Sequence, residues 1–314
     1  MKNSNLSLFA LCAVLGLAPV STARADFTPY SGTVKLRVTD HRGAAVDQDF
    51  TINVAGPSGG VTTWLHIPQT SLPSGLVVPA FNVMKYEARS GAVSTPTGAP
   101  AASITWVAAR TACQALGSGY DIMKESQWLA IAHDAMNVAA NWTGGSVGSG
   151  MLMRGNSDQT SALASQGDDA LGYSGVSGEY LRRTLLLSTG DVIWDMAGNI
   201  AEWVYCDDGR TGCSGGGTTG SAYANKPIGY GQEFSTVTPP SGNSDIKPGS
   251  YTSANGIGTV TSGGTSFGPI IRGGSFSYST YWGGSYTGLF TLDASYGYYY
   301  STNGVNIGYR CVGP

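Results

Sequence analysis

Glycine occupies 46 of the 314 positions of this chain and recurs along its whole length. Inside a helix or a strand, glycine costs roughly 0.5–1 kcal/mol relative to alanine, so a chain this rich in glycine favours turns and short elements. Charged residues make up only 12% of the sequence, which is low for a helical bundle with solvated faces. The composition therefore predicts a loop-rich fold and not a helical bundle, and the strand and helix signals described below make it an α+β fold.

Residues 1–25 have the order of a cleavable secretory signal. A basic residue precedes the apolar run Leu6 to Val20, and Ala23-Arg24-Ala25 supplies the small residues of a cleavage site. This run is shorter than the roughly 20 apolar residues that span a membrane. Lipid attachment at Cys12 is a poorer interpretation, because that residue lies inside the apolar run. We expect a mature protein that begins near Asp26, has no membrane span, and is secreted, periplasmic or displayed on the cell surface.

The mature protein is mildly acidic. The chain holds 17 lysines and arginines, of which Lys2 and Arg24 belong to the signal, so 15 remain against 20 acidic residues. A nucleic acid or an anionic membrane surface attracts proteins that carry a basic field. We expect no nucleic-acid partner.

Four cysteines lie outside the signal, at Cys113, Cys206, Cys213 and Cys311. An even number in an exported chain predicts two disulfides. Cys206 and Cys213 are close enough in sequence for their loop to close on itself, and Cys113 with Cys311 would then close a long loop. A zinc site is a poorer interpretation, because no two of these cysteines have the spacing of a close ligand pair.

Residues 26–76 read as a small β module. Thr33 to Val38 and Phe50 to Val54 alternate apolar and polar residues on either side of a turn, and Val61 to Ile67 is a further strand signal. Such a short segment buries little apolar surface, so we expect it to pack on the larger domain that comes after it in the chain.

Residues 77–314 form the main domain of this prediction. Helices are predicted over Ser103 to Leu116 and over Lys124 to Ala139, because apolar residues recur there at spacings of three and four. Beyond Asn141 the chain reads mostly as glycine-rich loops. Val192 to Met196 and Ile270 to Phe276 stand out as strands.

Several segments of this main domain follow one another in a recognisable order. They are Ile104 to Arg110, Tyr120 to Trp128, Trp194 to Val204, Arg272 to Phe276 and Asn306 to Cys311. In order and spacing they resemble the formylglycine-generating enzyme (sulfatase-modifying factor) family, from about Val78 to the C-terminus. The resemblance implies a variant of the C-type lectin fold for residues 77–314. It also implies the pairing of Cys113 with Cys311.

The segment Asp195 to Trp203 reads as a framework turn. Gly198 permits a tight backbone, and Asn199 and Glu202 can hold neighbouring amides. In relatives this region also binds calcium, so the resemblance offers a structural calcium ion at Asn199 and Glu202 as an alternative.

The resemblance does not extend to catalysis. Enzymes of this family hold copper with two cysteines, and the corresponding positions here are Tyr278 and Gly283, which cannot replace a thiolate ligand. The three histidines, His41, His66 and His133, form no readable ligand cluster or catalytic triad. Asp195 and Glu202 could be a glycosidase pair, but they lie in the framework turn. We expect this protein to be no enzyme and to have no catalytic residue and no metal cofactor. The alternatives are a divergent metal-dependent oxidase of the same family and a structural surface component.

Residues from about 273 to 310 are crowded with Tyr, Ser, Gly and Asn. A core does not tolerate so many phenols without a partner for each hydroxyl, whereas this composition is typical of antibody paratopes. The pattern resembles the variable proteins of diversity-generating retroelements, which diversify C-terminal codons on this lectin-type fold. An ordinary solvated loop is the alternative. We expect a displayed surface that binds an unknown protein or glycan on another cell or surface. The predicted contact residues are Tyr278, Tyr281, Trp282, Ser285, Tyr286, Asp293, Ser295, Tyr296, Tyr298, Tyr299, Tyr300, Thr302 and Asn303.

Overall fold

The structure is a computed structural model that describes residues 30–39, 45–54, 62–205, 229–233, 245–246, 249–262, 269–277, 283–293 and 306–314. The predicted signal peptide, residues 1–25, lies outside the described residues. The chain divides into two compact units, Met1–Gly59 and Gly60–Pro314.

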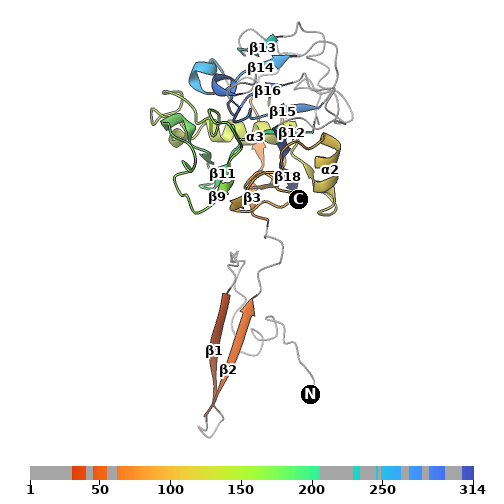
Figure 1. Cartoon of the computed structure of the whole chain (residues 1–314), viewed down its shortest axis with the longest axis vertical. Coiled ribbons are helices and arrows are strands. Elements are labelled where there is room, and N and C mark those ends of the chain that lie inside the picture. The colour runs from red at the N-terminus through yellow and green to blue at the C-terminus, as the bar shows by residue number, and fades with distance from the viewer. Residues whose placement is uncertain are drawn as a thin grey trace. The chain divides into compact units, whose positions relative to one another are not determined.

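The described residues of the first unit form one antiparallel pair (Figure 1). Strand β1 (Tyr30–Thr39) pairs with β2 (Ala45–Val54), so that Tyr30 lies opposite Val54 and Thr39 lies opposite Ala45. Both strands include the alternating segments from which they were predicted.

The boundary between the units differs from the predicted one. Strand β3 (Trp64–Ile67), which we assigned to the small β module, pairs with β6 (Phe81–Met84) of the second unit. Leu65 and Ile67 are buried in the same apolar cluster as Phe81. The module therefore ends at residue 59 and not at residue 76, because the apolar face of β3 is covered by the larger core.

Where the structure describes it, the second unit is a loop-rich α+β arrangement of short strands with two α-helices, α2 (Trp106–Gln114) and α3 (Glu125–Met136). A four-stranded sheet has the order β3-β6-β18-β8, and a six-stranded sheet has the order β13-β14-β16-β15-β12-β17. Their further strands are β8 (Asp121–Ile122), β12 (Ala201–Val204), β13 (Gly229–Gln232), β14 (Val260–Ser262), β15 (Ile270–Arg272), β16 (Leu292–Asp293), β17 (Ile307–Tyr309) and β18 (Cys311–Gly313).

Three two-stranded sheets complete the described part of this unit. Their pairs are β4 (Thr70–Ser71) with β5 (Val77–Val78), β7 (Thr97–Gly98) with β9 (Ser165–Gln166), and β10 (Thr184–Leu186) with β11 (Val192–Trp194). Short 3-10 helices are η1 (Ala139–Asn141), η2 (Glu179–Leu181), η5 (Ser253–Asn255) and η6 (Gly284–Tyr286).

Local signals explain where the two helices begin. The Thr105 hydroxyl accepts a hydrogen bond of 3.0 Å from the Ala108 amide, which caps α2. At α3, the Lys124 amide donates to the side chain of Gln127, three residues further on, over 3.0 Å. Each of these bonds satisfies a backbone amide or fixes the first turn, so the predicted helices form close to their expected positions.

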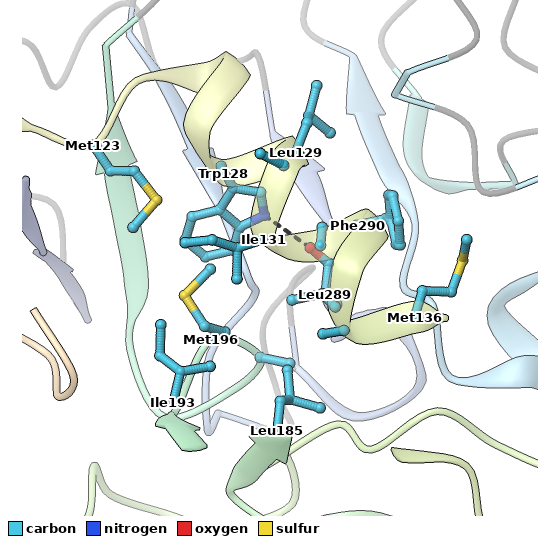
Figure 2. Close-up of a cluster of buried hydrophobic side chains, with 14 of the residues drawn as sticks. Met123, Trp128, Leu129, Ile131, Met136, Leu185, Ile193, Met196, Leu289 and Phe290 are labelled. Atoms are coloured by element: carbon cyan, nitrogen blue, oxygen red, sulfur yellow. Dashed lines mark hydrogen bonds between the residues drawn. The ribbon is translucent and has the colours of Figure 1, made fainter. Parts of the chain in front are cut away.

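Helix α3 forms the centre of the core (Figure 2). In Figure 1 it runs between β14 to β16 on one side and β3 and β18 on the other. Trp128 of α3 is fully buried, and its indole Nε1 donates to the carbonyl oxygen of Leu289 over 2.9 Å. Leu185, Ile193 and Met196 pack on the same cluster. The helix thereby joins segments that are more than a hundred residues apart in sequence.

The predicted disulfide between Cys113 of α2 and Cys311 of β18 is confirmed, with a sequence separation of 198 residues. Both cysteines lie in a second buried cluster that includes Trp106 and Trp203. The bond ties α2 to β18. The predicted partners Cys206 and Cys213 lie outside the described residues.

Candidate ligand-binding surface

Three of the thirteen predicted contact residues are described by the structure: Ser285, Tyr286 and Asp293. The other ten lie outside the described residues. They are Tyr278, Tyr281, Trp282, Ser295, Tyr296, Tyr298, Tyr299, Tyr300, Thr302 and Asn303.

Ser285 and Tyr286 lie on the short helix η6, and both side chains are exposed to solvent. Tyr286 is 39% exposed although it is a large aromatic residue. An exposed tyrosine presents a stiff apolar ring with a polar tip, which is the property that makes tyrosine common in paratopes. These two residues have the exposure expected of a contact surface.

The backbone beneath these two side chains is fixed from both ends of the turn. The Gly284 amide donates to the carbonyl oxygen of Ser157 over 2.9 Å, and Arg154 Nη1 donates to the carbonyl oxygen of Gly284 over 2.7 Å. The carbonyl oxygen of Tyr286 accepts hydrogen bonds from the hydroxyls of Thr291 at 2.7 Å and Thr259 at 3.4 Å. The side chains of η6 therefore project from a turn in which the main-chain groups of Gly284 and the carbonyl group of Tyr286 are already paired.

The loop that holds η6 is in turn bonded to the predicted framework turn. The carbonyl oxygen of Asn156 accepts from the Asn199 amide over 2.7 Å, and the carbonyl oxygen of Asn199 accepts from the Phe276 amide over 2.9 Å. The Gln159 amide donates to the carbonyl oxygen of Phe276 over 3.1 Å. A continuous set of main-chain bonds thus connects the framework turn to the start of the region from 273 to 310.

The Asn199 side chain is fully engaged at the centre of this framework. Its Oδ1 accepts from Asn156 Nδ2 at 2.9 Å and from the Leu163 amide at 2.7 Å. Its Nδ2 donates to Glu87 Oε2 at 2.5 Å. Asn199 has φ +61°, a conformation that asparagine tolerates better than most residues and that the surrounding bonds maintain.

Glu87 brings an unexpected buried carboxyl group to the framework turn. It is buried beside Asn199, and the Ile200 amide donates to its Oε1 over 3.0 Å. Burial raises the pKa of Glu87 well above its ordinary value, and the nearby carboxylates of Asp195 and Glu202 act in the same direction. The sequence contained no local signal for this role, because Glu87 and Asn199 are far apart along the chain.

The two carboxylates considered as a glycosidase pair each face an arginine. Asp195 Oδ2 lies 2.7 Å from Arg183 Nη2, and Glu202 Oε1 lies 2.8 Å from Arg310 Nη2. All four side chains are buried. This arrangement makes both carboxylates part of the framework, and it engages the Glu202 oxygens that a calcium ion would need. Calcium at Asn199 and Glu202 stays a prediction.

Asp293 differs from the other two described contact residues, since it is only 1% exposed. It lies on β16, where it is opposite Ile271 of β15 in the sheet register. A carboxylate inside a sheet is not presented to a ligand in the way that Tyr286 is. The composition of the region could not distinguish the buried Asp293 from the exposed Tyr286, because no local change in residue types marks the start of β16 at Leu292.

Sequence reasoning missed a group of side chains next to η6. The Arg154 guanidinium lies over the Tyr180 ring, 4.7 Å from its centroid, and the Tyr180 hydroxyl lies 3.5 Å from Asp158 Oδ2. Arg154 is only 5% exposed, and its Nε is buried without a partner in the described part of the chain. These residues precede η6 by more than a hundred positions, so no spacing in the sequence connects them to it.

Two positions bear on metal chemistry. Gly283, one of the expected copper-ligand positions, is described and buried just before η6, whereas Tyr278 lies outside the described residues. His133 is buried in α3, and its Nε2 lies 2.6 Å from the carbonyl oxygen of Asp245. Over the described ranges, no group of three or more His, Cys, Asp and Glu side chains is placed to hold a metal ion.

No protein-family model matches this chain, and no curated protein sequence matches it. Among the helices that the structure describes, none has the length and apolar character needed to cross a membrane.

Proposed function

We propose that this chain is an exported, non-enzymatic ligand-binding protein. Its second unit is a C-type lectin-like domain of the formylglycine-generating-enzyme type, and the region from 273 to 310 is a surface that can vary in sequence. The protein is then a variable protein of a diversity-generating retroelement, and its ligand is a protein or glycan on another cell or surface.

The observation that carries this proposal is the contrast at η6 between exposed side chains and a fixed backbone. The carbonyl oxygen of Tyr286 is held by Thr291, and the amide and carbonyl of Gly284 are held by Ser157 and Arg154. Substituting Ser285 or Tyr286 leaves all these main-chain bonds in place. A surface that changes its side chains without losing its shape needs this separation.

Two further features support the proposal. The disulfide between Cys113 and Cys311 suits an oxidising compartment and therefore suits export. It also ties the end of the candidate surface to α2, because Cys311 directly follows the region from 273 to 310. A binding loop that is held still loses less conformational entropy when it binds.

The nucleotide sequence around the gene tests the proposed diversification. We expect a neighbouring reverse transcriptase gene and a near-copy of the DNA that encodes residues 273–310, with differences concentrated at adenines. A gene neighbourhood without both elements contradicts this part of the proposal and leaves an ordinary lectin-like binding domain.

Substitution of surface tyrosines tests the binding function. The mature protein is screened on a glycan array and on an array of exported proteins, and the strongest ligand is then titrated against a variant with Tyr286, Tyr296, Tyr298, Tyr299 and Tyr300 all changed to Ser. We expect binding to be lost with a nearly unchanged melting temperature. Tyr173→Ser, a change outside the candidate surface, is the matched control and should bind normally.

A large loss of stability in the multiple variant would instead mark these tyrosines as core residues. The enzymatic alternative is tested separately by copper titration with a thiol-peptide oxidation assay. Robust turnover in that assay would overturn the non-enzymatic proposal.

A further inference from the structure

A hollow of about 320 Å³ opens in the second unit between two segments that the candidate ligand-binding surface does not use. One wall is formed by Arg89, Ser90 and Val93, and the other by Ala99, Pro100 and Ala101. The first wall is a tight reversal in which Arg89 and Val93 pair as an antiparallel bridge. The volume of the hollow is at the small end of the range that ligand sites occupy, roughly 300–1,000 Å³.

The Arg89 side chain is held in one position at this hollow. Its Nη1 donates to the hydroxyl of Thr95 at 3.0 Å and to the carbonyl oxygen of Thr97 at 3.1 Å. The guanidinium also packs closely on Gly98, where an added Cβ would lie 2.5 Å from Arg89 Cζ. A ligand that binds Arg89 therefore meets a guanidinium that is already oriented.

The other edge of the same guanidinium is free. Among the described residues, Arg89 Nε and Nη2 have no hydrogen-bond acceptor, and no carboxylate forms an ion pair with Arg89. Among the described side chains, the polar atoms that are both buried and unpartnered are Arg154 Nε and Asn156 Oδ1. The unpartnered Nε and Nη2 of Arg89 are therefore not buried. The two donors are thus accessible and unpaired, in the parallel geometry that fits the two oxygens of a carboxylate.

Two residues close in sequence to the lining of the hollow have an uncommon backbone conformation. Ala92, within the tight reversal, has φ +56°, and Ser103, two residues after Ala101, has φ +60°. Positive φ is uncommon for residues other than glycine, and such residues concentrate at ligand sites, where the surrounding structure maintains the strain. They flank the lining residues Val93 and Ala101 in sequence.

We propose that this hollow binds a small aliphatic carboxylate, whose two oxygens accept hydrogen bonds from Nε and Nη2 of Arg89. The short apolar body of the ligand then contacts Val93, Ala99 and Pro100. A single cation neutralises a carboxylate, whereas a phosphate dianion would keep a net charge beside these apolar walls. The carboxylate belongs either to a free acid or to the C-terminus of a polypeptide. This site is independent of the proposed function of the region from 273 to 310.

Titration of the full mature chain, followed by nuclear magnetic resonance of the added compound, tests the site. The probes are propionate and butyrate as free acids, propionamide as a neutral analogue, and a tripeptide ending in alanine with either a free or an amidated C-terminus. We expect at least one carboxylate form to bind while its amide does not. Binding of the free acids, the free tripeptide or both identifies the source of the carboxylate. Equal binding of acids and amides, or no binding of any acid, overturns the proposal.

Three variants locate the binding. Arg89→Gln should weaken carboxylate binding roughly ten- to hundredfold, as expected for the loss of charge-assisted hydrogen bonds. Arg110→Gln, which removes another partly exposed arginine, should leave carboxylate binding unchanged. Because Arg89 also holds Thr95 and Thr97, Ala99→Phe provides a second test: the exposed Ala99 accepts a larger side chain without unfolding, and the ring fills the hollow. Unaltered carboxylate binding in both Arg89→Gln and Ala99→Phe would show that the acid binds elsewhere.

Discussion

Arg310 and Glu202 form a buried, forked ion pair. Arg310 Nη2 lies 2.8 Å from Glu202 Oε1, and Arg310 Nε lies 3.1 Å and 3.2 Å from the two carboxylate oxygens. The same guanidinium donates to the carbonyl oxygens of Met84, Lys85 and Trp194. One side chain near the C-terminus thus joins β6, β11 and β12, and it satisfies carbonyl groups that burial would otherwise leave unpaired.

Removing one partner of this pair should be costly. We expect Arg310→Met to lower the free energy of unfolding by about 3–5 kcal/mol, because Glu202 and three carbonyl groups lose their donor in a buried setting. The matched control is Arg110→Met. Arg110 pairs with Asp121 at 2.9 Å, but both side chains are partly exposed, so that change should cost about 1 kcal/mol or less. Urea unfolding of both variants measures the difference, and equal costs would contradict the assigned role of Arg310.

The long-range disulfide should contribute more stability than the short one predicted from the sequence. The bond between Cys113 and Cys311 closes a separation of 198 residues, for which the chain-entropy model gives about 5 kcal/mol. The corresponding value for the short loop between Cys206 and Cys213 is about 2.5 kcal/mol. Guanidinium unfolding of the two double Cys→Ser variants compares them. Non-reducing peptide mapping checks the pairing of Cys113 with Cys311. A link from either of these cysteines to Cys206 would show that the assigned pairing is wrong.

Stability should fall in mild acid because of His133. Burial lowers the pKa of His133 below its ordinary value of 6.5. The unfolded chain therefore binds a proton as the pH falls below about 6.5, while the folded protein does not, so stability present above that pH is lost on acidification. His133→Gln keeps a donor that can reach the carbonyl oxygen of Asp245. The melting temperature of this variant should therefore depend less steeply on pH than that of the wild type. His66→Gln, at an exposed position, serves as the control in melting experiments between about pH 7 and pH 5; parallel curves for wild type and His133→Gln would refute the explanation.

Two glycines with similar backbone angles should respond differently to alanine. Gly155 has φ +64° and an added Cβ there would overlap the carbonyl oxygen of Ala197, whereas Gly190 has φ +86° and open space around it. Gly190→Ala should cost only backbone strain, about 1–2 kcal/mol. Gly155→Ala should cost about 1–3 kcal/mol more, since the loop that holds η6 must shift. Urea unfolding distinguishes them, and the same cost at both positions would contradict the close contact at Gly155.

Calcium should have little effect on the melting temperature. The Asn199 side-chain oxygen already accepts two protein hydrogen bonds, and both Glu202 oxygens already contact Arg310. A ligand that binds only the folded protein raises stability with its concentration. Melting curves in calcium and in a chelator test this expectation, and a marked rise in calcium would favour the ion that the resemblance offers.

The sequence by itself determined the local features of this protein. The helices predicted over Ser103 to Leu116 and Lys124 to Ala139 contain the observed α2 and α3, because apolar spacing and a capping threonine act within a few residues. The pairing of Cys113 with Cys311 also came from the cysteine count and the resemblance. These signals need no knowledge of which distant segments meet.

Only the tertiary structure decided which distant segments meet. It assigned β3 to the larger unit, buried Asp293 in a sheet while leaving Tyr286 exposed, and connected Arg154 to the turn that carries Tyr286. Strand partners and buried charge pairs form between residues brought together when the chain becomes compact, so the local residue pattern does not contain them. The free edge of Arg89 became visible for the same reason, since only folding shows which arginines have found a carboxylate and which have not.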